Sequence, residues 1–366
     1  MEYKIVTSIA TPNIALTKYW GKRNKDLILP YNSSVSITLN EELKTETSVA
    51  VLPGKGEDIF YLNGVKQNVS DKDIKEQLDA LKFMKELKKG AELENTHLVV
   101  YSKNYFPTAA GFASSASGIA ALVYALNEAY GLGLSGKELS ILARRGSGSS
   151  CRSIFGGFVE WYKGELNDGS DSYAEMLFPP SHIEDLVIIA AAIKSEQKKV
   201  SSRGGMAQTV ETSKLYKLWP ESVEKDTNEI IDAIRKKDLN KMYEIIMQST
   251  DRLHAVALDT FPPIIYLNDV SFDVIYKILD FNKQEGTNVA AYTFDAGPNP
   301  FIITTKKYKE KVIDLLKNTN GVKADSIYIL APGNGPRLVK ENEKSETREE
   351  LEKILATLNE KSVNYV

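Results

Sequence analysis

The sequence predicts an α+β protein built as two abutting lobes. Short apolar segments rich in β-forming residues dominate the first hundred residues, and turn residues separate them. From residue 114 onward helical patterns appear, and toward the C-terminus they alternate with strand patterns. A chain of 366 residues is long enough for two such lobes, and we expect them at residues 1–190 and 191–366.

The first lobe is expected to be mainly a sheet, followed by two helices. Helix 114–130 has apolar residues at helical spacing and ends before Gly131, whereas helix 135–145 has Ser135 as a candidate N-cap. The expected strands of this lobe are 3–7, 34–39, 45–52, 58–62, 97–102 and 156–161, with a further helix at 72–88.

The second lobe is expected to mix helices and strands. The run 186–193, at the junction of the lobes, is almost continuously apolar, which predicts a strand buried on both faces. The charged tail 341–361 predicts a solvated helix. The other expected elements are helices 222–236, 239–252, 272–284 and 307–317 and strands 289–294, 300–304 and 326–330.

The composition excludes several classes of protein. Forty-six basic and 49 acidic residues give a net charge of −3, so we expect no nucleic-acid partner. The single cysteine, Cys151, excludes an internal disulfide, and the three widely separated histidines predict no metal site. We see no secretory signal and no apolar stretch near the roughly 20 residues that span a bilayer, so we expect no membrane contact and a cytoplasmic location.

Three segments rich in glycine and serine suggest a ligand with several anionic groups. Segment 107–117 leads into helix 114–130, whose first N–H groups and hydroxyls suit a phosphate, although small residues there could also serve packing alone. Segments 144–153 and 200–206 add arginines, which bind phosphate or carboxylate through two parallel hydrogen bonds but are also common in solvated turns. The first segment is not the common P-loop, because no Gly-Lys-Ser/Thr follows it.

Seven segments together resemble a known family. They are 18–23 (Lys-Tyr-Trp-Gly-Lys-Arg), 29–34 (Leu-Pro-Tyr-Asn-Ser-Ser), 106–115, 146–153, 157–161, 254–263 and 292–299. In type and order they resemble the diphosphomevalonate decarboxylases, a family of the GHMP small-molecule kinase superfamily. The resemblance implies a two-lobed GHMP kinase-like fold with the active site in the cleft between the lobes. It also implies a homodimer and a decarboxylase of isoprenoid synthesis by the mevalonate route, acting on a small phosphorylated mevalonate.

The resemblance also assigns roles to residues. Asp295 would face the reacting carbon, and Lys18 would pair with it and with the leaving phosphate. Arg152 would hold the substrate carboxylate, and Ser115 the phosphoryl group. The other residues implied are Tyr19, Lys22, Ser147, Ser149 and Ser202 at the 5-phosphate end, Arg203 near that phosphate, Asn32 orienting Arg152 or the substrate, and Gly111, Ala113, Ser114 and Ser115 in the phosphate loop.

Without the resemblance, several of these residues have simpler interpretations. Asp295 precedes Ala-Gly-Pro-Asn and would be a turn-forming residue. Lys18 and Lys22 lie four residues apart and could form one solvated helix face. His254 would be a hydrogen-bonded structural histidine, and Cys151 a buried small residue.

Departures from the family pattern lie beside the expected nucleotide and phosphate sites. Phe112 replaces a leucine of the phosphate loop, and Tyr105 replaces an asparagine just before it, so both add bulk near the nucleotide. Arg203 stands where the family usually has a threonine. An arginine that the family supplies is not evident near residues 72 and 73.

These departures favour a branch that resembles mevalonate 3,5-bisphosphate decarboxylase. Such an enzyme eliminates phosphate and CO2 to give isopentenyl phosphate, and it requires no ATP and no metal. The alternative is an ATP- and Mg²⁺-dependent diphosphomevalonate decarboxylase that gives isopentenyl diphosphate. A mevalonate kinase of the superfamily and a non-catalytic binding protein are further hypotheses. The retained Lys18 and Asp295 argue against the kinase, and the retained charged residues argue against the binding protein.

Overall fold

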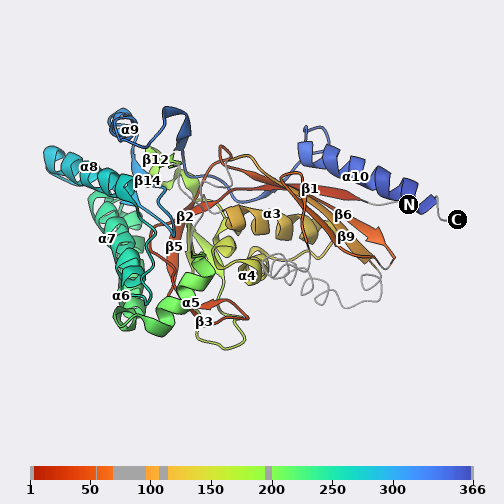
Figure 1. The fold of residues 1–366 in the computed structure, drawn as a ribbon, viewed down its shortest axis with the longest axis horizontal. Helices are drawn as coiled ribbons and strands as arrows, with labels where there is room; N and C mark the ends of the chain where they lie inside the picture. Colours follow the sequence, from red (N-terminus) through yellow and green to blue (C-terminus); the bar gives the residue numbers. More distant parts are fainter. Residues whose placement is uncertain (1–3, 55, 69–95, 107–113, 194–199, 364–366) are drawn as a thin grey trace.

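The predicted mixture of sheets and helices is confirmed by the structure, a computed structural model (Figure 1). It describes residues 4–54, 56–68, 96–106, 114–193 and 200–363. The expected helix 72–88 and the loop residues Gly111, Phe112 and Ala113 lie outside these described residues.

A six-stranded sheet forms the core of one half of the molecule. Its central strands pair over long, regular registers, because alternating apolar residues give both faces something to bury. In order across the sheet the strands are β16 (Arg337–Leu338), β1 (Ile5–Ala10), β6 (Thr45–Pro53), β9 (Thr96–Asn104), β7 (Ile59–Leu62) and β8 (Val65–Lys66).

Among the described residues, helices cover both faces of this sheet (Figure 1). Val49 of β6 packs in the cluster beneath α3 (Ser114–Ala129), whereas the next residue, Ala50, packs in the cluster beneath α10 (Glu346–Val363). Alternation along a strand therefore sends neighbouring side chains to different helices. The end of the chain thus returns to the sheet that its beginning builds, and the division at residue 190 stays a prediction.

The C-terminal tail is a helix as predicted, but the expectation that it is solvated is wrong. Leu351 and Leu355 are completely or almost completely buried against the sheet. The helix start is held by the buried carboxylate of Glu46, which accepts hydrogen bonds from Ser345 Oγ (2.6 Å) and Thr347 Oγ1 (2.8 Å). A carboxylate at this end also complements the helix dipole.

A four-stranded sheet lies between the two halves. Next to it, α4 (Gly136–Gly146) begins at the predicted N-cap, because the Ser135 side chain and Glu138 form a capping box. The segment that follows α4 is a 3₁₀ helix, η2 (Gly148–Ile154), rather than a loop. The strands in order are β11 (Ala174–Phe178), β10 (Phe158–Trp161), β5 (Ser34–Thr38) and β2 (Asn13–Ala15), and a separate pair is β3 (Lys22–Asn24) with β4 (Leu29–Pro30).

The other half is a second four-stranded sheet with its helices. Its strand β12 (Leu186–Ala191) is buried along its whole length, as the apolar run predicts. The other strands are β13 (Ala290–Thr293), β14 (Phe301–Thr305) and β15 (Ile327–Leu330). The helices are α6 (Trp219–Lys236), α7 (Leu239–Leu258), α8 (Asp269–Glu285) and α9 (Lys309–Lys317), with short 3₁₀ turns η3 (Pro180–Ile183), η4 (Leu215–Leu218) and η5 (Ala324–Ser326).

Helix α5 (Ser202–Thr212) was expected to begin as a loop, and that prediction is wrong. Its glycines made the sequence look like a loop, but Ser201 caps the helix by accepting a hydrogen bond from Gly204 N. Ser202 and Arg203 therefore lie in a helix N-terminal turn, where their directions are fixed by the helix.

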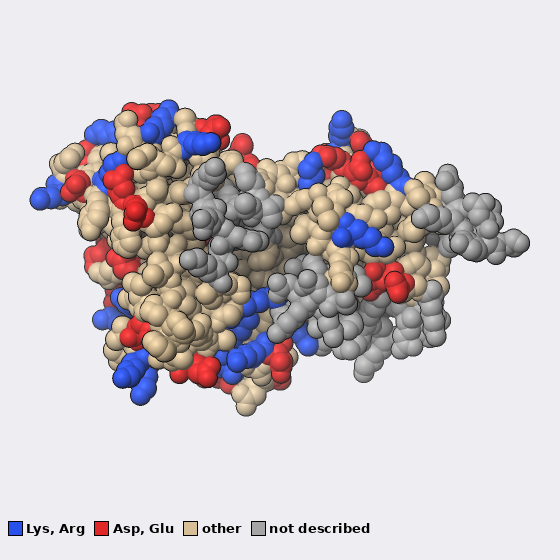
Figure 2. All heavy atoms as spheres, in the orientation of Figure 1, with Lys and Arg blue, Asp and Glu red and all other residues tan. Residues whose placement is uncertain are grey.

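Charges of both signs are mixed on the face of the described residues that Figure 2 draws. On the face drawn in Figure 2, acidic and basic side chains are intermixed over both halves, in keeping with the net charge of −3. In the part of the chain that the structure describes, no helix combines the length and the apolar character needed to cross a bilayer.

Truncating Leu351 tests whether α10 is part of the first sheet's core. We expect Leu351→Ala to lower the free energy of unfolding by about 2–5 kcal/mol, because it leaves a cavity between the helix and the sheet. Leu218→Ala is the matched control, since Leu218 is 66% exposed, and it should change stability by less than about 0.5 kcal/mol. Equal stabilities of the two variants in urea titrations would contradict the docked helix.

Candidate functional site

Lys18 and Asp295 form an ion pair at the junction of the two halves. Lys18 Nζ lies 2.7 Å from Asp295 Oδ1 and also donates to the carbonyl of Ala15 at 3.0 Å. The lysine side chain is 1% exposed, whereas the aspartate side chain is 40% exposed. Burial lowers the pKa of Lys18, and the neighbouring Asp295 opposes that shift. The pair therefore consists of a partly exposed carboxylate, called half-open below, and the buried amino group of Lys18.

Helix α7 positions both partners of the ion pair. Ser249 Oγ accepts a hydrogen bond from the backbone N–H of Lys18 at 3.0 Å. One residue further along the helix, Thr250 Oγ1 donates to Thr293 Oγ1 at 3.0 Å, and Thr293 ends the strand that leads to Asp295. Two segments far apart in sequence are thus aligned by one rigid helix.

Asn32 contacts Lys18 in this structure, not Arg152 as one expectation held. Its Nδ2 donates to the carbonyls of Lys18 (2.9 Å) and Ser33 (2.8 Å). Its Oδ1 accepts from Trp219 Nε1 at 2.9 Å. Since both amide N–H groups and the oxygen have protein partners, Asn32 fixes the backbone that carries Lys18.

Arg152 is a buried cation held by neutral groups. Its Nε donates to Asn13 Oδ1 (3.1 Å) and its Nη1 to Ser34 Oγ (2.7 Å), and the residue is 2% exposed. Among the described residues, no Asp or Glu carboxylate lies within 4.0 Å of the Arg152 guanidinium, so Arg152 forms no ion pair with them. Burial lowers the pKa of Arg152, while the more distant charge of Asp295 raises it. Among the described residues, the side-chain hydrogen-bond partners of Arg152 are therefore neutral.

The three charged residues lie close enough to influence one another's pKa. The charge of Arg152 further lowers the pKa of Lys18, after burial and the opposing effect of Asp295. Asp295 in turn raises the pKa of Arg152, although the three residues come from three different segments. The sequence prediction missed Asn13 and Ser34, which set the orientation of Arg152.

Tyr19 brings an unpaired hydroxyl to the same region. Its Oη is buried and has no hydrogen-bond partner among the described residues, and burial raises the pKa of Tyr19. The ring meets Trp161 edge-on, with 4.7 Å between ring centroids. Gly148 permits this packing, since a Cβ there would lie 3.0 Å from the Tyr19 ring and 2.9 Å from Trp161. An unpaired buried hydroxyl favours a polar ligand beside it.

Hydroxyl groups gather at the start of α3. Ser115 is exposed in the first turn of this helix, and its Oγ lies 3.4 Å from Ser147 Oγ at the C-cap of α4. Ser149, two residues on, is half-buried and its carbonyl accepts a hydrogen bond from Asn13 Nδ2. The start of a 16-residue helix with two hydroxyls can bind an anion. The backbone of Ser114 begins this helix, while Gly111 and Ala113 lie outside the described residues.

Arg203 links the third expected segment to the second. Its Nη2 donates to the carbonyl of Gly146 at 3.0 Å, which joins the start of α5 to the end of α4. Ser202 lies beside it, half-buried. Lys22 lies on β3 and not on a helix with Lys18, so the solvated-helix interpretation of these lysines is wrong.

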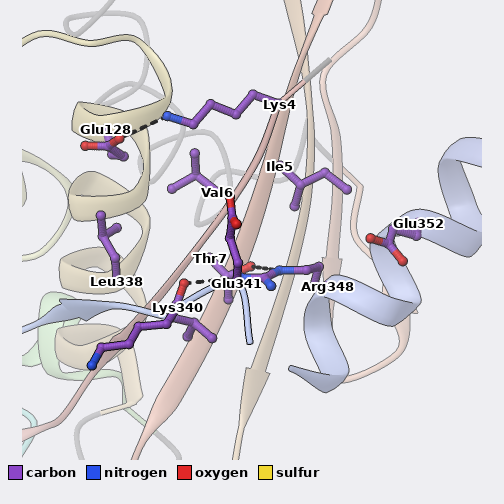
Figure 3. A pocket seen from close by; sticks show the side chains of 11 residues that line it. Lys4, Ile5, Val6, Thr7, Glu128, Leu338, Lys340, Glu341, Arg348 and Glu352 are labelled. Carbon is purple, nitrogen blue, oxygen red and sulfur yellow. Dashed lines mark hydrogen bonds and ion pairs between the residues drawn. The ribbon is translucent and has the colours of Figure 1, made fainter. Parts of the chain in front are cut away.

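A separate pocket lies at the far end of the first half (Figure 3). It is bounded by β1, α3 and α10, and its charged residues are Lys4, Glu128, Lys340, Glu341, Arg348 and Glu352. Three cations and three carboxylates leave it without net charge. Glu128 lies 13 residues along α3 from Ser115, or roughly 20 Å at 1.5 Å per residue, so this pocket is remote from the hydroxyl groups at the start of α3.

Breaking the ion pair should expose the cost of burying Lys18. We expect Asp295→Asn to lower the free energy of unfolding by about 2 kcal/mol, less than the 3–5 typical of fully buried pairs because Asp295 is half-open. The double variant Lys18→Met/Asp295→Asn buries no charge there and should recover most of that loss. Urea titration would measure the free energy of unfolding of wild type, Asp295→Asn and the double variant. An Asp295→Asn variant as stable as wild type would contradict the buried pair.

Two protein-family models match this chain. Residues 10–174 match the diphosphomevalonate decarboxylase-like N-terminal domain, and residues 187–366 match the mevalonate 5-diphosphate decarboxylase C-terminal domain. The chain is 40% identical over 323 residues to the diphosphomevalonate decarboxylase of Danio rerio. The aligned region covers 87% of this chain and 80% of that protein.

Solved structures show the same similarity. MDDEF in complex with MVAPP, AMPPCP and magnesium has a TM-score of 0.82 at 39% identity, covering 93% of this chain and 100% of that chain. Mevalonate diphosphate decarboxylase from Staphylococcus aureus has a TM-score of 0.83 at 37% identity, covering 93% and 99%. The predicted GHMP-type fold is thereby confirmed. The chain belongs to the diphosphomevalonate decarboxylase family.

Proposed function

We propose that this protein is an ATP-dependent carboxy-lyase that converts mevalonate 5-diphosphate to isopentenyl diphosphate, with release of CO2, phosphate and ADP. The observation that carries the proposal is the buried Arg152, which has neutral hydrogen-bond partners and lies beside the Lys18–Asp295 pair. A site of this charge suits a substrate that bears a carboxylate next to a carbon from which a phosphate departs.

Arg152 would bind the substrate carboxylate. A guanidinium carries five N–H donors in a planar fork, and Asn13 and Ser34 accept from two of its nitrogens. The remaining donors are fixed in direction by those two bonds. The carboxylate would thus be held in line with the breaking C–C bond. The entropy of orienting it would be lost on binding, before the reaction begins.

Asp295 and Lys18 would act at the tertiary carbon. The half-open carboxylate of Asp295 would accept the proton of the 3-hydroxyl or orient that hydroxyl as it gains a phosphoryl group. As the C–O bond to phosphate breaks, positive charge develops on the carbon, and the negative charge of the Asp295 carboxylate would stabilise it. Lys18 and Arg152 favour the departing anion, and loss of CO2 leaves the electron pair that forms the double bond.

The hydroxyl groups near α3 fit the phosphates of a nucleotide and its magnesium ion. Ser115 and Ser147 offer hard oxygen atoms, whereas the described residues contain no group of three or more His, Cys, Asp or Glu side chains that could cage a metal. Mg²⁺ in nucleotide sites usually keeps several waters and binds substrate phosphates with one or two protein carboxylates, rather than an all-protein cage. Bound there, it would supply charge neutralisation for the phosphates. Tyr19, Lys22, Ser149, Ser202 and Arg203 would bind the 5-diphosphate.

The ATP-dependent reaction is better supported than the ATP-free 3,5-bisphosphate reaction expected from the sequence. Tyr105, one basis of that expectation, reaches the α10 side of the sheet, opposite to α3, where its hydroxyl lies 3.4 Å from Glu346 Oε2. Its bulk is therefore directed away from the start of α3. The similar structure of MDDEF contains AMPPCP, a nucleotide analogue, with magnesium.

Nucleotide dependence is tested with two substrates. We expect CO2 release from mevalonate 5-diphosphate only when ATP and Mg²⁺ are present, with one ADP formed per CO2. Mevalonate 3,5-bisphosphate without nucleotide should give no CO2. Release of CO2 from the bisphosphate in the absence of ATP would reverse this ranking.

The orientation of Arg152 is tested on strand β5. Ser34→Ala removes the acceptor of Nη1, and we expect kcat/KM for mevalonate 5-diphosphate to fall about 10- to 100-fold, since hydrogen bonds to charged groups contribute about 1.5–3 kcal/mol. Ser36→Ala is the control, because Ser36 is also buried on the same face of the strand but its Oγ has no partner among the described residues. Similar kinetics for the two variants would remove Ser34 from the site.

A further inference from the structure

Helix α8 has apolar side chains on two opposite sides. On the inner side, Ile278 and Phe281 are 1% and 6% exposed and pack in the core of the second sheet and its helices. On the outer side, Phe272, Tyr276 and Leu279 are 45%, 64% and 43% exposed. A surface helix needs only one apolar face to pack on its own domain. The outer side chains are therefore not needed to attach α8 to the described residues.

The three outer residues form one stripe along the helix. Phe272, Tyr276 and Leu279 follow one another at intervals of four and three residues, which places them side by side on one face. Single exposed apolar residues are ordinary on protein surfaces, whereas a contiguous apolar patch indicates an interaction site. Phe and Tyr are also enriched in protein interfaces. Figure 1 shows α8 at the end of the molecule opposite α10, where a partner could approach it.

The charges at the two ends of the stripe indicate which partner fits. Asp269 in the first turn and Lys283 in the last turn are both exposed, and each lies seven residues from Tyr276. Seven residues make almost two helical turns, so both charges lie on the line of the stripe. If two copies of α8 lie antiparallel with Tyr276 at the centre, Asp269 of each copy faces Lys283 of the other. A parallel arrangement would place like charges together.

The remaining charged side chains near the stripe are compatible with this pairing. Asp273 and Lys277 form an ion pair with each other at 2.9 Å and so balance their own charges. Asp280 is exposed and follows Leu279, at the edge of the stripe, where its carboxylate can stay in water when the stripe is covered. The stripe is therefore apolar in its middle and carries opposite charges at its ends.

We propose that two copies of this chain associate through α8, antiparallel about a two-fold axis at Tyr276. The same stripe then serves both copies, and the association closes at two. Covering the apolar side chains would favour association, while the two Asp269–Lys283 contacts would set its direction. Three large side chains per copy make a small contact, so we expect a weak dimer with a dissociation constant in the micromolar range.

Reversing the charges tests the direction of the pairing. Sedimentation velocity on the full chain gives the dissociation constant of the dimer. We expect Asp269→Lys to raise it about 10-fold, because the two-fold axis applies the change twice and puts like charges opposite each other. The double variant Asp269→Lys/Lys283→Asp restores opposite charges and should return to within about threefold of wild type. Glu352→Lys is the matched control, since Glu352 is exposed on α10 at the other end of the molecule.

The double variant also separates pairing from helix stability. Asp269 and Lys283 suit the dipole of their own helix, so each reversal makes the helix itself less favourable. The double variant carries both of these penalties. Recovery of the dimer in that variant therefore reports the contact between copies and not the stability of α8.

A cysteine at the proposed axis tests the location. Tyr276→Cys would bring two thiols together in the dimer, and oxidation by diamide should join the chains through a disulfide. Cys151, the cysteine of the wild-type chain, is buried and should not react. Leu218→Cys is the control, because Leu218 is 66% exposed and lies outside the stripe. We expect a covalent dimer from Tyr276→Cys and a single chain from Leu218→Cys on a non-reducing gel.

The contrary outcomes are equally definite. Wild-type protein that remains monomeric well above micromolar concentration would overturn the proposal. A dimer that Asp269→Lys leaves unchanged, or equal cross-linking of the two cysteine variants, would do the same. None of these measurements involves CO2 release, so failure of this inference and failure of the proposed function are distinguishable.

Discussion

Two cations, Lys18 and Arg152, are buried beside one half-open carboxylate, and the surrounding structure has to support that arrangement. Taking a charge out of water costs several kcal/mol unless hydrogen bonds and opposite charge replace the lost hydration. Lys18 receives this from Asp295 and a carbonyl, whereas the acceptors that Arg152 finds among the described residues are neutral. The local excess of positive charge favours binding of an anion, and the substrate would supply that anion.

Three segments of the fold bring these charged residues together. Lys18 follows β2, Arg152 lies on η2, and Asp295 follows β13. Neutral side chains then fix each group, namely Asn32 and Ser249 for Lys18 and Asn13 and Ser34 for Arg152. Because such groups carry no charge, they orient the cations without neutralising them, and the electrostatic preference for a ligand is preserved.

Much of the fold could be predicted from local pattern. Strand β6 was expected at 45–52 and runs from Thr45 to Pro53, since alternation and turn residues bound it clearly. Helix α5 was missed because its glycines lower helix propensity, and only the cap and packing stabilise it. The burial of α10 was missed because two leucines are few among many charges, and only the sheet beneath them shows their role.

The site could be predicted only in part. Lys18, Arg152 and Asp295 came from the resemblance to a family, since nothing in their spacing joins residues so far apart. Asn13 and Ser34 were missed because their partner lies 139 and 118 residues away, a relation that exists only once the strands are paired. The polar alternation of β5 was the available signal, because a polar face on a buried strand must find partners.

The preference of Arg152 for a carboxylate is measured most directly by a thermodynamic cycle. In this cycle, the binding affinities of two ligands are compared on wild type and on a variant of Arg152. Calorimetry would compare mevalonate 5-diphosphate with an analogue in which methyl replaces the CH2–carboxylate, on wild type and on Arg152→Gln. Wild type should bind the carboxylate-bearing ligand at least about 10-fold more tightly, and the variant should bind both ligands within about threefold. A preference for the carboxylate that survives in Arg152→Gln would contradict the account.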